Sequence, residues 1–383
     1  MIAPRDAFNS SIFHVRINDH GRISCMGSNL DQEARLGLAC MSDLFLGALL
    51  FAAVQTTALD AQICISEYLP ELRYINQRVP IHHLASHSTG YLPPCVEFQN
   101  IDDLMGWFSA HTPAFSAGET VDYTRLEAGL LTAILERVLG DSIEHLLERW
   151  LFAPAGIGGS WSISRSPTGI PRMDMSLVQV ELLAQYIKSP DFFDGRLADA
   201  LQSRTATIDI TRHVLSPTHP VAYGWGLALF RSGMWGVNGF SSQHPVGLRF
   251  DIASSFVMTA AVQEQPALRD LILDQMGRRH RPASTLRQAG AGWGSVRGLD
   301  AQDLPGRYTG SEENVVNVTL ASDRLDFELC GRGREPTRFS TRLDQDTIVG
   351  DLKWSLRGEF FPHLQTKRPC LVLGIKSFVK EEP

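Results

Sequence analysis

Hydrophobic periodicity changes along the chain, and this change constrains the fold more than any other feature of the sequence. Within residues 123–140, apolar side chains from Leu126 to Val138 recur at the i, i+4 spacing of one helix face, and Gly140 ends the pattern. Over residues 223–262 the pattern becomes a series of short strands, among them VGLRFDI and SSFVMTAAV. The chain therefore combines a helical stretch with a strand-rich stretch.

Other segments fit one of these two patterns. Residues 12–27 hold two alternating runs around Asn18-Asp19-His20-Gly21, which predicts a β-hairpin. Helical spacing extends over a larger set of segments, which we predict as helices: residues 43–58, 101–110, 123–140, 142–152, 175–205 and 266–278.

The C-terminal part of the chain has strand character throughout. Leu325, Phe327 and Leu329 alternate with acidic residues, as in a half-buried strand, and similar short runs continue towards the C-terminus. We predict a small all-β, barrel-like domain over residues 304–383. Residues 286–303 mix Arg, Gly, Ala and Pro without periodicity and are predicted as a linker, which leaves residues 1–285 as the first domain.

Charge and composition exclude several classes of function. The 383 residues carry a net charge of −7, which gives no electrostatic basis for binding nucleic acid or an anionic membrane. The most apolar run, residues 44–54, is too short to span a bilayer, and the N-terminal residues do not resemble a secretory signal. We therefore expect a cytoplasmic protein, whose oligomeric state the sequence leaves open.

The six cysteines form no CxxC pair and no dense framework. This scatter argues against a zinc site and against a disulfide scaffold, so free thiols are expected. Nothing else in the sequence indicates a metal or another cofactor, and none is predicted.

Four segments together resemble the serine β-lactamase and penicillin-binding-protein superfamily, in particular its class C-related esterases and peptidases. They are ISEYLPEL (65–72), HHLASHSTGYLP (82–93), residues 115–157 and residues 222–251, in the family's order. The resemblance implies an α+β fold in which an antiparallel sheet is flanked by helices beside an all-helical subdomain. It also implies an active site in the groove between them, and the C-terminal segment resembles a β-barrel that some members append. His87 matches a structural position and is expected to brace its loop.

In this superfamily the nucleophile is the Ser of a Ser-x-x-Lys motif at the start of the central helix, and here that region reads LACMSDLF (38–45). One register makes Ser42 the nucleophile and puts Phe45 at the Lys position. The other puts Cys40 at the nucleophile and Asp43 at the Lys. The second is preferred because it matches the family at Ala39 and keeps the distance to YLPEL free of gaps. Neither register retains the Lys.

The remaining motifs of the resemblance are also altered. Tyr-x-Asn becomes Tyr123-Thr124-Arg125, and His-x-Gly becomes Val237-Asn238-Gly239. Since the family's Lys and Asn lie against each other, Asp43 and Arg125 are expected to form an ion pair across the groove. Ser42, Asn238, Gly239 and Phe240 are assigned to substrate binding.

Three functional hypotheses follow. The first is a repurposed biosynthetic enzyme that acts on a small molecule with Tyr123, Asp43, Arg125 and Cys40, by acid/base cyclisation or elimination or by thiol-dependent acyl chemistry. The second is a pseudoenzyme that binds a ligand or a partner without turnover. The third is a conventional serine hydrolase, an esterase or peptidase, that uses Ser42, and the missing Lys makes it the weakest.

Overall fold

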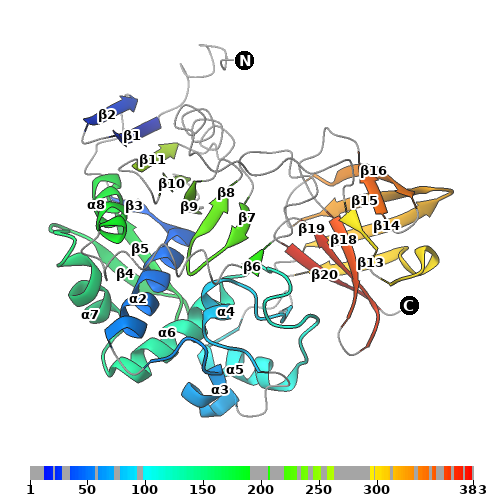
Figure 1. The fold of residues 1–383 in the computed structure, drawn as a ribbon, viewed down its shortest axis with the longest axis horizontal. Helices are drawn as coiled ribbons and strands as arrows, with labels where there is room; N and C mark the ends of the chain where they lie inside the picture. The colour runs from blue at the N-terminus through cyan, green and yellow to red at the C-terminus, as the bar shows by residue number, and fades with distance from the viewer. Residues whose placement is uncertain are drawn as a thin grey trace.

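The computed structural model describes most of the two predicted domains. The described residues are 13–19, 22–27, 35–56, 59–72, 78–92, 98–189, 206–207, 220–230, 234–239, 245–251, 257–262, 294–296, 298–310, 314–331, 335–344, 347–350, 358–363, 366–373 and 376–381. The chain has an α+β fold of the β-lactamase type, followed by an all-β half-barrel (Figure 1).

The first unit is built on an antiparallel sheet in the order β2-β1-β11-β10-β9-β8-β7-β6. Its strands are β1 (Phe13–Asp19), β2 (Arg22–Gly27), β6 (Ala206–Thr207), β7 (Pro220–Tyr223), β8 (Ala228–Phe230), β9 (Trp235–Gly239), β10 (Val246–Phe250) and β11 (Val257–Val262). The predicted N-terminal hairpin is present, and β1 pairs with β11, for example Ile17 opposite Met258. The two ends of the first unit thus meet in one sheet.

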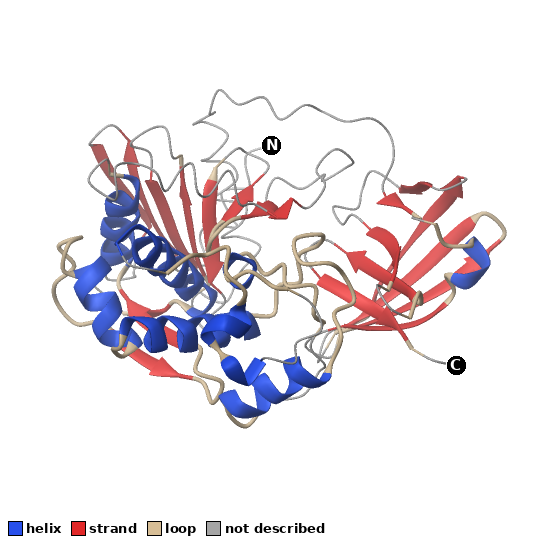
Figure 2. Ribbon diagram, turned by 60° about the horizontal axis from the view of Figure 1, so that its bottom comes forward, coloured by secondary structure: helices blue, strands red, loops and turns tan. Residues whose placement is uncertain are grey.

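Apart from a short 3₁₀ turn in the half-barrel, η5 (Ala301–Asp303), the described helices gather beside this sheet (Figure 2). They are α2 (Ser42–Thr56), α3 (Ile65–Tyr68), α4 (His82–Ala85), α5 (Ile101–Ala110), α6 (Leu126–Leu139), α7 (Ile143–Leu147) and α8 (Leu177–Lys188). A 3₁₀ turn, η1 (Ala39–Met41), leads into α2, and a π-helical turn, η3 (Glu148–Phe152), follows α7. None of the described helices is both long enough and apolar enough to cross a membrane.

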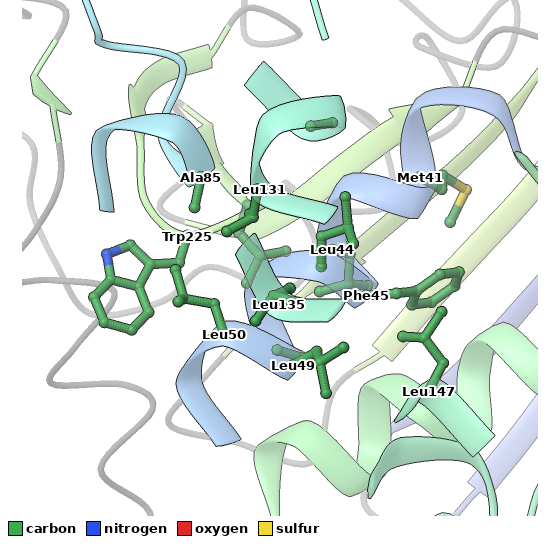
Figure 3. Close-up of a cluster of buried hydrophobic side chains, with 14 of the residues drawn as sticks. Met41, Leu44, Phe45, Leu49, Leu50, Ala85, Leu131, Leu135, Leu147 and Trp225 are labelled. Atoms are coloured by element: carbon green, nitrogen blue, oxygen red, sulfur yellow. The ribbon is translucent and has the colours of Figure 1, made fainter. Parts of the chain in front are cut away.

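Helix α2 is the centre of this unit, and residues 41–53 are all buried. Figure 3 shows its side chains enclosed by Leu131 and Leu135 of α6, Leu147 of α7 and Trp225. A helix that is apolar on every side must be covered on every side, which explains its place between the sheet and the other helices. Its first turn, which carries Ser42 and Asp43, is therefore held in a fixed position.

A second, small sheet orders β3 (Leu36–Gly37), β5 (Pro171–Met175) and β4 (Ser162–Arg165). β3 immediately precedes η1, and its pairing with β5 places Leu36 opposite Met175. This sheet anchors the chain just before it enters α2.

The C-terminal unit is an antiparallel sheet in the order β12-β17-β16-β15-β14-β13-β20-β19-β18. Its strands are β12 (Gly294–Ser295), β13 (Gly306–Gly310), β14 (Val315–Ala321), β15 (Arg324–Cys330), β16 (Thr337–Asp344), β17 (Thr347–Gly350), β18 (Gly358–Pro362), β19 (Pro369–Leu373) and β20 (Lys376–Lys380). Leu325 and Phe327 point into its own core, as the alternation predicts. Val296 bridges to Phe360, so the two ends of the sheet approach each other as in a barrel.

The two units touch through a small apolar contact. Phe115, in the loop before α6, packs edge-on against Phe361 of β18 with ring centroids 5.7 Å apart, and Cys370 lies in the same cluster. The half-barrel is thereby attached to the loop region that also carries residues of the site described below.

The structure can be compared with the predicted helices and with the predicted linker. The helix predicted over residues 101–110 coincides with α5, and that over 43–58 corresponds to α2. The helix predicted over residues 175–205 ends at Lys188 as α8, because Ser189 has extended backbone dihedrals. The helix predicted over residues 266–278 lies outside the described residues. The linker predicted over residues 286–303 is described only in part and contains β12, so the domain boundaries stay a prediction.

Candidate active site

The start of α2 supplies the first groups of the site. Cys40 lies in η1, partly exposed and in no disulfide, and Asp43 follows three residues later with 5% exposure. Ser42 Oγ donates a hydrogen bond to the carbonyl oxygen of Ala39 at 2.9 Å and so closes the first turn. Residues three apart lie on one helix face, so the thiol in η1 and the carboxylate in the first turn of α2 are expected on the same side of this helical segment.

Asp43 is the hub of a buried polar cluster. The Tyr123 hydroxyl donates to Asp43 Oδ2, and Arg125 Nε donates to Asp43 Oδ1 at 3.1 Å. Arg125 Nη2 also donates to Ser42 Oγ and, at 3.4 Å, to the carbonyl oxygen of Pro171. The predicted Asp43–Arg125 ion pair is therefore present, with 16% of the Arg125 side chain exposed.

The surroundings shift the proton affinities of two of these groups. Burial, the negative charge of Asp43 and the nearby Cys40 raise the pKa of Tyr123 well above its ordinary value. Burial alone would lower the pKa of Arg125, but the opposing influence of Asp43 and Cys40 raises it above its ordinary value. The site thus holds a protonated phenol and a fixed cation around one carboxylate. Cys40 lies close enough to influence both groups.

Ser42, which the sequence assigns to substrate binding, is enclosed at the start of α2. Its side chain is fully buried, its proton is donated to the carbonyl oxygen of Ala39, and its oxygen accepts from Arg125. In this arrangement Ser42 holds the guanidinium, and its proton is directed at a backbone carbonyl and not at a side-chain base of the described residues.

Sequence reasoning missed three residues that enclose the cluster. His87, 2% exposed, stacks on Tyr123 with ring centroids 4.4 Å apart, and Tyr223 of β7 lies 5.7 Å from Tyr123. Glu127 of α6, 1% exposed, accepts from Thr124 Oγ1 at 2.8 Å. Two of them carried a signal in the sequence: His87, expected only to brace its loop, and Glu127, an acidic residue on the apolar face of the clearest helix.

Backbone strain concentrates around Asp43. Ala39, His87 and Arg125 have φ values of 46°, 52° and 63°, and the other two non-glycine residues with positive φ in the described part of the chain lie in the half-barrel. Such a conformation costs on the order of 1 kcal/mol or more per residue and often marks a functional site. Each of the three residues belongs to a different segment bordering the cluster.

The strand predicted to bind substrate, β9, runs beside η1, the turn that leads into α2. A Cβ at Gly239 of β9 would overlap the carbonyl oxygen of Leu38, so the glycine permits this close approach. Asn238 is partly exposed, and its side-chain oxygen has no hydrogen-bond partner among the described residues. Phe240 lies outside the described residues.

The site offers no metal-binding arrangement within the described ranges, where no three His, Cys, Asp or Glu side chains gather to hold an ion. What it can supply is one carboxylate that binds both a phenol and a guanidinium, with a thiol close enough to influence the last two. These groups suit proton transfer and nucleophilic attack on a carbonyl.

Comparison with known proteins agrees with the fold. Residues 20–176 match the family model described as Beta-lactamase. No curated protein matches the chain by sequence.

Solved structures are similar over different lengths of the chain. SurE, in a crystal structure with D-Leu, superposes with a TM-score of 0.70 at 13% identity over 96% of this chain and 95% of its own. A β-lactamase/D-alanine carboxypeptidase from Pseudomonas syringae gives a TM-score of 0.58 at 16% identity, over 73% of this chain and 96% of its own. A D-stereospecific amidohydrolase from Streptomyces sp. gives a TM-score of 0.54 at 12% identity. The match covers 71% of this chain and 96% of the amidohydrolase. At these identities the likeness shows the fold alone, and the SurE match extends it through the half-barrel.

Proposed function

We propose that this chain, which has the β-lactamase/transpeptidase-like serine hydrolase fold, is an acyl-transfer enzyme whose nucleophile is Cys40. The supporting observation is the contact between Asp43 and Tyr123. It connects the residue three positions after Cys40 to the surviving tyrosine, as the motif Lys and Tyr do in the family the chain resembles. The enzyme acts on a small molecule in a cytoplasmic biosynthetic pathway, where thiols stay reduced.

The proposed chemistry uses Tyr123 as a relay. Cys40 Sγ attacks the carbonyl carbon of an acyl donor, and its proton passes to Tyr123 Oη while Tyr123 passes its own proton to Asp43 Oδ2. The tetrahedral intermediate collapses to a thioester, and the leaving group takes a proton back along the same path. An amine or water then attacks the thioester, its proton takes the same path, and the thiol is restored.

Arg125 and the local pKa values support this assignment of roles. Arg125 Nε holds Asp43 Oδ1, which leaves Oδ2 directed at the tyrosine. The raised pKa of Tyr123 means that the phenol exchanges protons in a concerted step instead of resting as phenolate. The guanidinium also favours negative charge at the neighbouring thiol, because their mutual attraction stabilises both charged forms.

The acyl donor is proposed to carry a D-configured residue at the reacting carbonyl. SurE was crystallised with D-Leu, and the Pseudomonas syringae and Streptomyces proteins are named for D-alanine and D-stereospecific substrates. An N-acetylcysteamine thioester of D-leucine, with its L-leucine counterpart, is therefore the probe of choice.

Selective labelling tests the nucleophile. Iodoacetamide is expected to modify Cys40 faster than Cys330, a similarly exposed thiol in β15 that lies at no helix start, and the D-leucyl thioester is expected to acylate Cys40 alone. Cys40→Ala should abolish acylation, whereas Cys330→Ala should leave it unchanged. Acylation at Ser42 would instead favour the serine hydrolase hypothesis.

A second function has its own support. The protonated phenol of Tyr123 could serve as a proton donor in a non-covalent cyclisation or elimination, because the raised pKa keeps its proton available. Loss of pathway product in Tyr123→Phe but not in Cys40→Ala would select it. Retention of product in both variants would leave a pseudoenzyme that binds without turnover.

A further inference from the structure

His87 lies between two buried carboxylates and has no role in the relay proposed above. Its Nε2 is 3.7 Å from Asp43 Oδ2, and its Nδ1 is 3.9 Å from Glu127 Oε2. Both ring nitrogens are buried and neither makes a hydrogen bond among the described residues. A buried polar side chain without partners is costly, so this placement calls for a function.

Only one protonation state suits both neighbours. A neutral imidazole carries a proton on one nitrogen and a lone pair on the other, so it would turn a lone pair towards one carboxylate. An imidazolium presents an N–H to each. Distances just beyond hydrogen-bond length keep the attraction between the charges, because little solvent reaches the site to screen it.

Charge balance leads to the same state. Glu127 accepts from two hydroxyls, Thr124 Oγ1 at 2.8 Å and Thr89 Oγ1 at 3.4 Å, as an ionised carboxylate does. With Asp43 it places two carboxylates beside His87, and the guanidinium of Arg125 binds only that of Asp43 among the described residues. An uncompensated buried charge is strongly unfavourable, and an imidazolium at His87 removes it.

We propose that His87 is a positioning residue held as an imidazolium between Asp43 and Glu127, where it supplies the positive charge that the missing motif Lys would have supplied. It keeps Asp43 Oδ2 directed at the Tyr123 hydroxyl and couples the site to Glu127 on α6. Its left-handed backbone, with φ of 52°, aims the ring into this gap, and Asp122 N fixes the loop by donating to the carbonyl oxygen of His87 at 2.9 Å.

The titratable and charged groups that the described residues place around His87 come from four segments. They are Asp43 from α2, Glu127 from α6, Tyr223 from β7, and Asp122, Tyr123 and Arg125 from the segment that ends at the start of α6. The carboxylates of Asp43 and Glu127 favour the charged ring, and the pKa values of the two phenols are raised, so they remain neutral.

The inference rests on the proposed function only for its consequence at Cys40, and its test does not need turnover. Long-range ¹H–¹⁵N spectra of the full chain, labelled with ¹⁵N-histidine and without substrate, report which ring nitrogens carry protons. His83 is the internal reference, because burial and His82 lower its pKa to about 4 and it is neutral at neutral pH.

At neutral pH the expected result is that both His87 nitrogens are protonated while His83 carries one proton. In Glu127→Gln, which retains an acceptor for the threonines, His87 should lose a proton. A singly protonated His87 ring in the unmodified protein would overturn the proposal. The His87 signals are assigned from their contact with the Tyr123 ring, so the test does not require a His87 variant to fold.

A second readout separates positioning from mere packing. In His87→Gln, acylation of Cys40 should slow by about tenfold or more and its pH profile should change, because Asp43 is no longer held towards Tyr123. An unchanged rate and profile in a folded variant would overturn the positioning role. If Cys40 is never acylated, the proposed function fails while the spectra still decide the charge of His87.

Discussion

Two arginine–carboxylate pairs in this chain have similar chemistry and opposite surroundings. Arg137 meets Glu71 through two hydrogen bonds of 2.8 and 2.7 Å, and both side chains are 45% exposed. Arg125 meets Asp43 through a single bond of 3.1 Å, but Asp43 is 5% exposed and also accepts from Tyr123. The pair with the better geometry is the one in water.

The difference indicates what each pair does. An exposed pair joins two elements at little net gain, because water competes for both charges. A buried pair is retained at a desolvation cost, and its partners become dependent on each other. The Asp43 pair stands where three strained backbone positions and a partly exposed thiol converge, which is the expected setting of a functional site.

The largest effect should come from removing the buried acceptor. Asp43→Ala leaves the Arg125 cation and the Tyr123 hydroxyl without their partner, and we expect a loss of about 3–5 kcal/mol in the free energy of unfolding. Glu71→Ala is the matched control and should lose less than about 1 kcal/mol. Urea unfolding of both variants measures the two losses, and equal losses would contradict the comparison.

His83 extends the comparison to a partly buried group that forms no ion pair with another described residue. Burial and the neighbouring His82 lower its pKa to about 4 from 6.5, so between these values the unfolded chain binds more protons than the folded one. Stability should therefore fall as the pH drops from about 6.5 to about 4, by at most about 3 kcal/mol from this residue. Thermal unfolding across this range should show a shallower decline in His83→Gln, and an identical decline would exclude His83 as the cause.

Tyr123→Phe tests a smaller part of the buried cluster. It removes the hydroxyl that donates to Asp43 but keeps the ring contacts with His87 and Tyr223. A hydrogen bond to a charged acceptor contributes about 1.5–3 kcal/mol, so we expect a loss of about 2 kcal/mol in urea unfolding. An unchanged free energy of unfolding in Tyr123→Phe would show that Asp43 accepts a hydrogen bond from another donor.

Salt should produce the smallest effect and separate the two pairs most simply. The Arg137 partner lowers the pKa of Glu71 to about 2, but both side chains face solvent and are screened. A double-mutant cycle on Arg137 and Glu71 should give a coupling energy under about 1 kcal/mol, and this energy should vanish at high ionic strength. The coupling energy of Arg125 and Asp43 should stay the same at high ionic strength. An equal decline in the coupling energies of both pairs would contradict the difference in burial.

Much of the fold could be predicted from local pattern. The strand series from β7 to β11, the N-terminal hairpin, α5 and the half-barrel follow alternation or helical spacing within short windows. The approach of Val296 to Phe360 could not be predicted, because it depends on how the whole sheet curves.

The site was predictable only where a motif marks it. Asp43, Tyr123 and Arg125 stand at motif positions, and the structure brings them together. His87 enters through a left-handed backbone conformation and a long-range approach to Glu127, which no spacing rule encodes. Ser42, assigned to substrate binding, is a buried partner of Arg125 because its hydroxyl is turned into the first turn of α2.

The rate at which the D-leucyl thioester acylates Cys40 in the unmodified protein and in Tyr123→Phe tests the central claim most directly. Intact-protein mass spectrometry with peptide mapping should show one acyl group, on Cys40, that forms at least about tenfold more slowly in the variant. Iodoacetamide should still alkylate Cys40 in the variant, which establishes that the thiol remains accessible. Equal acylation rates, acylation at another residue or no acylation would contradict a thiol nucleophile served by the Tyr123–Asp43 relay.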